Sequence, residues 1–166
     1  MTSARKKVHE IFHTKTTAQN KIISEKNFTY RHLIKILKKY LKPGMEVLDI
    51  GCGSGTLDFY FAKKLKVKIT GIDISASAIS SCIQTARNLN MRNLKFKVLD
   101  FPNETLNKKF DLIIFSEVIE HLDQDHAALV RIHKLLKSNG LLFLSTPLSN
   151  APLSKVGLTE EFDKQV

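Results

Sequence analysis

Three glycines follow a short apolar run, and their spacing is typical of a ligand-binding turn. The run covers residues 45–50 and leads into Gly51, Gly53 and Gly55 in a G-x-G-x-G pattern. Glycine lets a strand turn tightly into a helix, and its missing side chain lets a ligand approach the backbone. Asp73 lies 22 residues after Gly51, where a strand-end carboxylate accepts both hydroxyls of a ribose. These features predict a site for an adenosine-containing cofactor.

The residues around the glycines favour a cationic cofactor over a dinucleotide. The loop lacks the extra residue of the G-x-G-x-x-G dinucleotide pattern. Asp49, just before the loop, would repel a pyrophosphate in a partly desolvated site. S-adenosylmethionine has no phosphate and carries an ammonium and a sulfonium, so nearby carboxylates attract it. We therefore predict S-adenosylmethionine as the cofactor.

Two later apolar runs also end in residues that suit this cofactor. Asp100 and Phe101 follow the third run, and Ser116 and Glu117 follow the fourth. Ligands bind outside the carboxyl ends of the strands in an open parallel sheet, so we expect these residues at one edge. Asp100 is expected to accept a hydrogen bond from the adenine amino group, with Phe101 near the ring.

The elements that position these residues alternate between strands and helices. Residues 22–41 have apolar positions at helical spacing, and Pro43-Gly44 follows them. Residues 118–136 form a second helix candidate, ending at Ser138-Asn139-Gly140. The strand candidates are apolar throughout, which is typical of parallel strands buried on both faces, and they cover residues 45–50, 67–72, 94–99, 110–115 and 141–145. The pattern predicts an α/β fold, a doubly wound parallel sheet of about five strands.

A second group of chemically capable residues follows the fourth run. Glu117, Glu120 and His121 form an E-x-x-E-H pattern, and on a helix beginning near Glu117 they share one face. Two carboxylates and an imidazole suit a divalent cation such as Mg, Mn or Zn. In the alternative interpretation Glu117 touches the cofactor, Glu120 is a solvated carboxylate, and His121 is a base or a polar wall.

Taken together, the motifs resemble those of class I S-adenosylmethionine-dependent methyltransferases. The segments V-L-D-I-G-C-G-S-G, G-I-D-I-S, L-D-F and F-D-L-I-I-F-S-E-V-I-E-H-L occur between residues 47 and 147 in that family's order. The resemblance implies a Rossmann-like fold, with Asp49 and the three glycines at the methionine end and Asp73 on the ribose. It places Ile74 and Phe101 beside the adenine, with Asp100 bonded to it, and we include Cys52 and Ser116 in the cofactor site.

The E-x-x-E-H pattern resembles the metal motif of ubiquinone-biosynthesis O-methyltransferases and of small-RNA 3′-terminal 2′-O-methyltransferases. A metal on Glu117, Glu120 and His121 would polarise an acceptor hydroxyl, and His121 with Glu117 is the predicted catalytic pair. The RNA enzymes place a further metal-binding histidine beyond strand five, and residues 147–166 contain none.

The ends of the chain carry separate expectations. We assign residues 1–20 to a polar N-terminal segment, 21–147 to the cofactor-binding domain and 148–166 to the start of a substrate-capping region. By the resemblance, a helix and a β-hairpin would normally follow strand five, so we expect a truncated fragment without that hairpin. Dimerisation through the uncovered strand at residues 141–145 is the alternative. The H-E-x-x-H pattern at residues 9–13 is interpreted as part of an amphipathic lid helix and not as a zinc protease site.

Charge and composition leave two kinds of acceptor open. The net charge is +10, and residues 1–46 carry eleven Lys and Arg against three Asp and Glu. Such a basic arm suits RNA, an anionic surface or an acidic partner, or is a solvated lysine-rich face. No run is long enough to span a bilayer, and the two cysteines form no disulfide framework, so we expect a cytoplasmic protein.

These observations predict methyl transfer to a small-molecule acceptor, with O-methylation first. RNA 2′-O-methylation is the alternative. A third reading is a cofactor-binding domain that is inactive because its acceptor region is missing.

Overall fold

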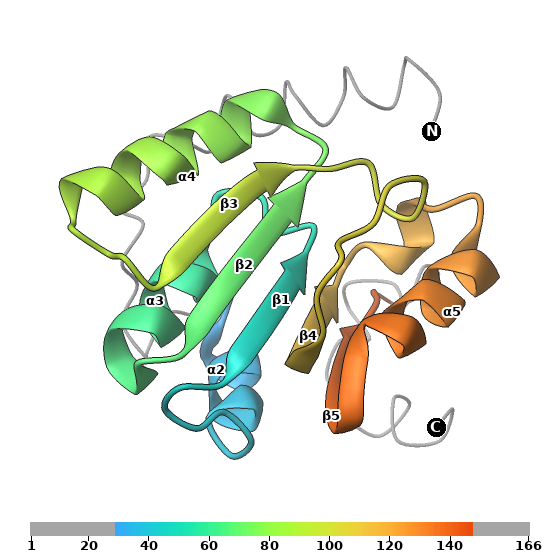
Figure 1. The fold of residues 1–166 in the computed structure, drawn as a ribbon, viewed down its shortest axis with the longest axis horizontal. Helices are drawn as coiled ribbons and strands as arrows, with labels where there is room; N and C mark the ends of the chain where they lie inside the picture. The colour runs from blue at the N-terminus through green and yellow to red at the C-terminus, as the bar shows by residue number, and fades with distance from the viewer. Residues whose placement is uncertain (1–28, 148–166) are drawn as a thin grey trace, which may run out of the picture.

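A computed structural model describes residues 29–147 of the chain, which form a five-stranded, all-parallel sheet (Figure 1). The strand order is β3-β2-β1-β4-β5, so the chain winds outward from β1 in both directions. The elements, in chain order, are α2 (Arg31–Leu37), β1 (Glu46–Ile50), α3 (Thr56–Leu65), β2 (Lys68–Asp73), α4 (Ala76–Asn88), β3 (Leu94–Val98), β4 (Phe110–Ser116), a 3-10 turn η1 (Ile119–His121), α5 (Asp125–Leu135) and β5 (Leu136–Ser145). The predicted doubly wound α/β fold is confirmed.

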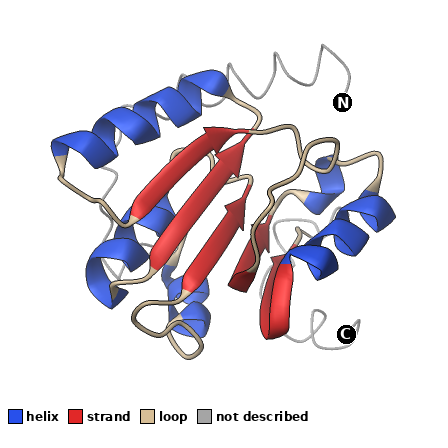
Figure 2. Cartoon of the chain, viewed as in Figure 1, coloured by secondary structure: helices blue, strands red, loops and turns tan. Residues whose placement is uncertain are grey.

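Helices cover both faces of the sheet, as Figure 2 shows. One buried cluster joins α2, α3 and α4 to Val47, Ile69 and Leu112 on three strands. A second cluster packs α5 against Leu48 and Ile113 on the opposite face. Because β1 and β4 contribute to both clusters, apolar residues face both sides of these strands, as is typical of central parallel strands.

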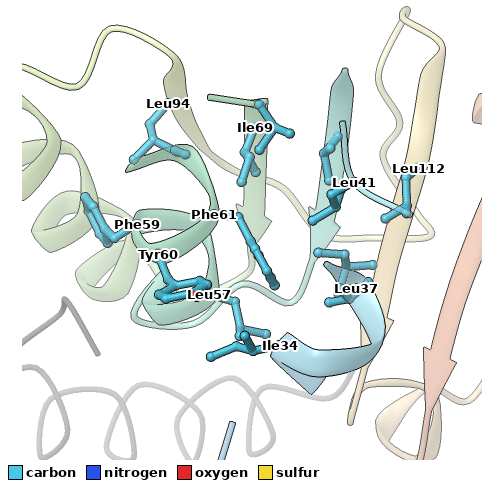
Figure 3. Packing of buried hydrophobic residues seen from close by; sticks show 14 of the residues in the cluster. Ile34, Leu37, Leu41, Leu57, Phe59, Tyr60, Phe61, Ile69, Leu94 and Leu112 are labelled. Atoms are coloured by element: carbon cyan, nitrogen blue, oxygen red, sulfur yellow. The ribbon is translucent and has the colours of Figure 1, made fainter. Parts of the chain in front are cut away.

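Helix α3 lies deepest in the first cluster (Figure 3). Its residues from Leu57 to Ala62 are all buried, and they share this cluster with residues of α2 and of the sheet. Tyr60 and Phe61 meet edge to face with ring centroids 5.2 Å apart. Burial of these consecutive residues holds the first turn of α3, which follows the glycine loop, in a fixed position.

Three predicted boundaries are wrong. The predicted helix over 118–136 is a single 3-10 turn followed by α5, which begins at Asp125. Helix α2 ends at Leu37, before Pro43-Gly44. Strand β5 begins at Leu136 and not at residue 141, and its first half is irregular, with Asn139 at φ 61° and a shift of register opposite Phe110 and Leu112.

The two edge strands differ from the centre. Strand β3 alternates Lys95 and Lys97 with Phe96, and β5 leaves Leu141 and Leu144 more than two-fifths exposed. None of the helices between residues 29 and 147 has the length and apolar character needed to cross a bilayer. The predicted segments 1–20 and 148–166, and the H-E-x-x-H pattern, lie outside the described residues.

Candidate functional site

The glycine loop joins β1 to α3 at the carboxyl edge of the sheet. The N–H groups of Gly51 and Cys52 both donate to the carbonyl of Ile72, at 2.8 and 3.0 Å, and Gly55 N–H closes the turn onto Cys52 at 2.8 Å. Gly51, Gly53 and Gly55 have φ values of 76°, 51° and 70°, a region that side chains strongly disfavour. The glycines predicted from the sequence are therefore required by the backbone.

Asp73 fixes this loop from the neighbouring strand. Its carboxylate accepts one hydrogen bond from Gly53 N–H and another from Ser75 N–H, each 2.8 Å long, and the residue is 7% exposed. The Ser75 hydroxyl in turn accepts from Ala78 N–H and caps α4. Each carboxylate oxygen keeps a lone pair, so Asp73 positions the loop and retains capacity to accept a ligand hydroxyl.

Asp49 and Cys52 lie beneath and within the loop. Burial, followed by the charge of Asp58, raises the pKa of Asp49 well above its ordinary value. Burial, followed by the charges of Asp58 and Asp49, also raises the pKa of the Cys52 thiol. Cys52 is therefore a protonated, half-buried wall of the site and not a nucleophile. Cys82, which the sequence analysis left unassigned, donates from Sγ to Gly53 O at 3.5 Å and ties α4 to the loop.

The two residues predicted to contact the adenine after β3 differ in their surroundings. Asp100 is next to Asp73, because Leu99 N–H donates to Asp73 O at 3.0 Å, and its carboxylate accepts from Asn103 at 3.3 Å. Phe101 is 7% exposed and its ring packs edge to face on Phe115 in the second cluster. The apolar core takes up most of this ring, so little of it remains exposed for the predicted contact with the adenine.

Ile74 fits a contact role better than Phe101 does. It follows Asp73 at the carboxyl end of β2 and is half-buried. Its side chain therefore keeps apolar surface that a ligand could cover.

The residues after β4 do not form the helix face that a metal site required. Glu117 N–H donates to Ser145 O at 2.9 Å, so the β4–β5 pairing continues past Ser116, and Glu117 has φ 56°. Ser145 bonds the hydroxyl of Ser116 at 2.7 Å and the carboxylate of Glu117 at 2.9 Å. Helical spacing therefore cannot apply to Glu117.

Glu120 and His121 are placed separately from Glu117. Glu120 accepts a hydrogen bond from Thr146 at 3.3 Å, and its carboxylate lies 4.0 Å from His121 Nε2. Between residues 29 and 147, no three His, Cys, Asp or Glu side chains gather closely enough to hold a metal ion. The side chains present do not fit the predicted metal, whereas the His121–Glu120 pair remains available for proton transfer.

Several residues at this edge escaped the sequence analysis. Val118 lies directly over Gly51, and Ser145 and Thr146 bond the two glutamates. Asp58 is fully buried on α3, next to the loop. Its signal in the sequence was a lone carboxylate inside the apolar segment L-D-F-Y-F.

A separate hollow lies between α4 and β3. It has a volume of about 590 Å³ and is lined by Arg87, Arg92 and Lys95 together with apolar residues that include Phe96. No predicted site residue lines it. The candidate site is therefore defined by the loop and the strand ends, and the hollow is a distinct basic surface feature.

Comparisons with known proteins are consistent with this geometry. A sequence model described as "Methyltransferase domain" matches residues 41–165. Phosphoethanolamine N-methyltransferase 1 of Arabidopsis thaliana is 40% identical over 110 residues, which are 65% of this chain and 22% of the plant protein. Ubiquinone biosynthesis O-methyltransferase of Glaesserella parasuis is 41% identical over 108 residues, 62% of this chain and 45% of that protein. This chain therefore spans less than half of either relative.

A solved structure supports the fold. Phosphoethanolamine N-methyltransferase 2 of Haemonchus contortus, in complex with S-adenosyl-L-methionine, superposes with a TM-score of 0.70 and 20% sequence identity. The superposition covers 93% of this chain and 39% of the nematode chain. At this identity the likeness bears on the fold alone.

Proposed function

Because the chain belongs to the methyltransferase domain family, we propose that the carboxyl edge of its sheet binds S-adenosylmethionine and that the protein methylates a small-molecule acceptor. The observation that carries the proposal is the Gly51–Gly55 loop, whose backbone Asp73 holds through Gly53 N–H at 2.8 Å. The loop presents bare backbone at the position where a cofactor lies in doubly wound sheets.

The charges around the loop support a cationic ligand. Asp49, Asp58 and Asp73 are each buried near the loop, and the groups that shift the pKa of Asp49 include no cation. A pyrophosphate would be repelled here, whereas an ammonium and a sulfonium are attracted. In this proposal Asp49 and the loop hold the methionine end, Asp73 the ribose, and Ile74 and Asp100 the adenine, with Cys52 and Ser116 as walls.

The chemical step requires little of the protein beyond positioning. S-adenosylmethionine supplies a methyl group activated by the sulfonium, which leaves as a neutral thioether after in-line attack. His121 is half-exposed, and its Nε2 lies 4.0 Å from Glu120. We assign His121 as the base that accepts the acceptor's proton, with Glu120 stabilising the imidazolium that forms. The Glu117 carboxylate, which accepts a hydrogen bond from the Ser145 hydroxyl at 2.9 Å, is not part of this pair.

We propose a hydroxyl as the acceptor, since a base beside the methyl group serves a weakly acidic O–H. Relatives of this chain carry the names of both N- and O-methyltransferases, so an amine is the competing acceptor. Radiolabelled S-adenosylmethionine incubated with catechol-type and ethanolamine-type acceptors would separate the two. Label appearing in catechols supports the proposal, and label confined to amines contradicts the O-acceptor. Cofactor binding without transfer to any acceptor would indicate an inactive binding domain.

An RNA acceptor is a second candidate, favoured by the hollow between α4 and β3. Arg87, Arg92 and Lys95 line it without an acidic neighbour among its lining residues. Phosphate contacts release counterions, so RNA binding through this hollow would weaken steeply with salt and would be reduced by Arg87→Ala and Arg92→Ala. Salt-independent or undetectable binding of single-stranded RNA would exclude this candidate.

A further inference from the structure

Asp58, on α3, is a fully buried acid whose carboxyl group lacks an ordinary hydrogen-bond donor. The residue is 0% exposed, and no donor among the described residues reaches either carboxyl oxygen. Its neighbours on α3 are Leu57, Phe59, Tyr60 and Phe61, all buried. An isolated buried carboxylate is strongly disfavoured, so this side chain must be neutral or must share a proton with a neighbour.

The register of the sheet identifies that neighbour as Asp49. Gly71 on β2 pairs directly with Asp49 on β1, so their Cβ directions point to the same face. A Cβ built on Gly71 would lie 2.8 Å from Asp58 Oδ2. The Asp58 carboxyl therefore occupies the space that Gly71 leaves empty, beside the Asp49 side chain.

Within residues 29–147, no cation is among the groups that shift the pKa of either acid. Asp73 from β2, Cys52 from the loop and Cys82 from α4 are the other titratable groups that act on this cluster, and each is an acid or a thiol. Burial raises the pKa of Asp58 to about 7, and hydrogen bonding to Asp49, which requires one of the two acids to keep its proton, offsets part of the increase. Burial, and then the charge and hydrogen bond of Asp58, raise the pKa of Asp49 well above its ordinary value.

We propose that Asp49 and Asp58 share a proton beneath the Gly51–Gly55 loop and titrate as one coupled acid, with Asp58 acting as a positioning residue for Asp49. A carboxyl group that keeps a proton donates an O–H···O hydrogen bond to its neighbour, which supplies the donor that Asp58 otherwise lacks. Gly71 is required in β2 because any larger side chain would displace this carboxyl.

The consequence for the cofactor rests on the proposed function. With one proton the pair carries a single negative charge, and with two protons it is neutral. A cationic sulfonium above the loop favours the singly charged form, so binding to the neutral pair releases one proton to solvent. Affinity for S-adenosylmethionine therefore rises with pH through the neutral range. S-adenosylhomocysteine lacks the sulfonium charge, so its affinity changes less.

Calorimetric titration of the full chain with both compounds tests this coupling. At about pH 6 and about pH 8, in buffers of different ionisation enthalpy, the preference for S-adenosylmethionine over S-adenosylhomocysteine should grow by up to about tenfold per pH unit. Proton release should accompany S-adenosylmethionine binding. In Asp58→Asn the release and the pH-dependent preference should both disappear, whereas Asp111→Asn, at the opposite edge, should keep both. A constant preference in wild type, or unchanged proton release in Asp58→Asn, would overturn the proposal.

Infrared spectroscopy of the cofactor-free protein tests the shared proton independently of ligand binding. Wild type at about pH 8 should show the carbonyl band of a protonated carboxylic acid, and Asp58→Asn should lose it, because its amide donates to an ionised Asp49. A band that persists in Asp58→Asn, or is missing from wild type, would contradict a shared proton. Failure of both cofactors to bind, with the band present, would instead count against the proposed function alone.

Discussion

Val118 packs onto Gly51, which brings the segment after β4 into contact with the loop after β1. A Cβ added at Gly51 would collide with Val118 Cγ2, and the glycine has φ 76°. The contact holds the first residues after β4 against the glycine loop. It also places Glu120 and His121, which follow Val118, near the glycine loop.

Gly51→Ala is therefore expected to destabilise the fold more than an alanine at another left-handed glycine. Gly44 has φ 84° with no atom within 4 Å of an added Cβ, so Gly44→Ala meets backbone strain alone, about 1 kcal/mol. Gly51→Ala adds the collision, a further loss of about 1–3 kcal/mol in the free energy of unfolding. Urea unfolding measures both.

Trimming the partner tests the cause of that difference. In Gly51→Ala/Val118→Ala the collision is removed, so the double variant should lose less stability than the two single losses combined. Equal costs for Gly44→Ala and Gly51→Ala would show that the Val118 contact is unimportant.

The buried acid on α3 predicts an unusual pH dependence of stability. The folded protein holds the Asp58 proton with a pKa of about 7, whereas the unfolded chain releases it near 3.8. Below 3.8 the proton is bound in both states, and between the two values unfolding releases it. The contribution of Asp58 to the free energy of unfolding is therefore largest in acid and declines from about pH 4 to about pH 7.

Asp58→Asn should flatten this decline, as chemical denaturation at a series of pH values would measure. Asp111 offers a control of opposite sign. Burial raises its pKa, but the hydrogen bonds from Lys137 at 2.9 Å and Glu46 N–H at 2.8 Å outweigh this and hold it below its ordinary value. Asp111→Asn should remove stability at neutral pH that wild type loses as the pH falls. If Asp58→Asn has the same pH slope as wild type, Asp58 does not titrate in this range.

His121→Ala is expected to slow methyl transfer by about 10²–10⁴-fold while leaving the affinity for S-adenosylhomocysteine within a factor of about two. The imidazole lies on η1, outside the glycine loop, so its loss should affect kcat more than cofactor binding. Glu120→Gln should show a smaller loss, because the base remains and only the stabilisation of its charged form is weakened. A His121→Ala variant with wild-type kcat would remove this residue from the mechanism.

The sequence predicted the sheet well because its central strands are rich in apolar residues on both faces and end in recognisable turns. Gly51 and Asp73 could be placed at one edge from strand order alone, and the structure links that loop to Asp73 through Gly53. The segment after Ser116 was misread, because apolar spacing from Val118 onward resembles a helix. The pairing of Glu117 with Ser145, a contact between residues far apart in sequence, prevents that helix from starting.

Side-chain partners were the least predictable part of the site. Asp58 is a lone carboxylate in an apolar segment, and only the packing of α3 in the first cluster shows that its side chain is buried. Phe101 follows Asp100 at a strand end, yet its ring packs against Phe115 in the second cluster. Both outcomes depend on tertiary packing, which local spacing does not specify.

Calorimetric titration with S-adenosylhomocysteine tests the central claim most directly, comparing wild type with Asp73→Ala and Asp111→Asn. Asp73→Ala removes the acceptor for Gly53 N–H and Ser75 N–H, so affinity should fall at least about tenfold, the loss of a charged hydrogen bond or more. Asp111→Asn changes a carboxylate at the opposite edge and should bind as wild type does. A cooperatively folded wild-type protein that binds NADH and not S-adenosylhomocysteine, or an Asp73→Ala variant with unchanged affinity, would contradict the account.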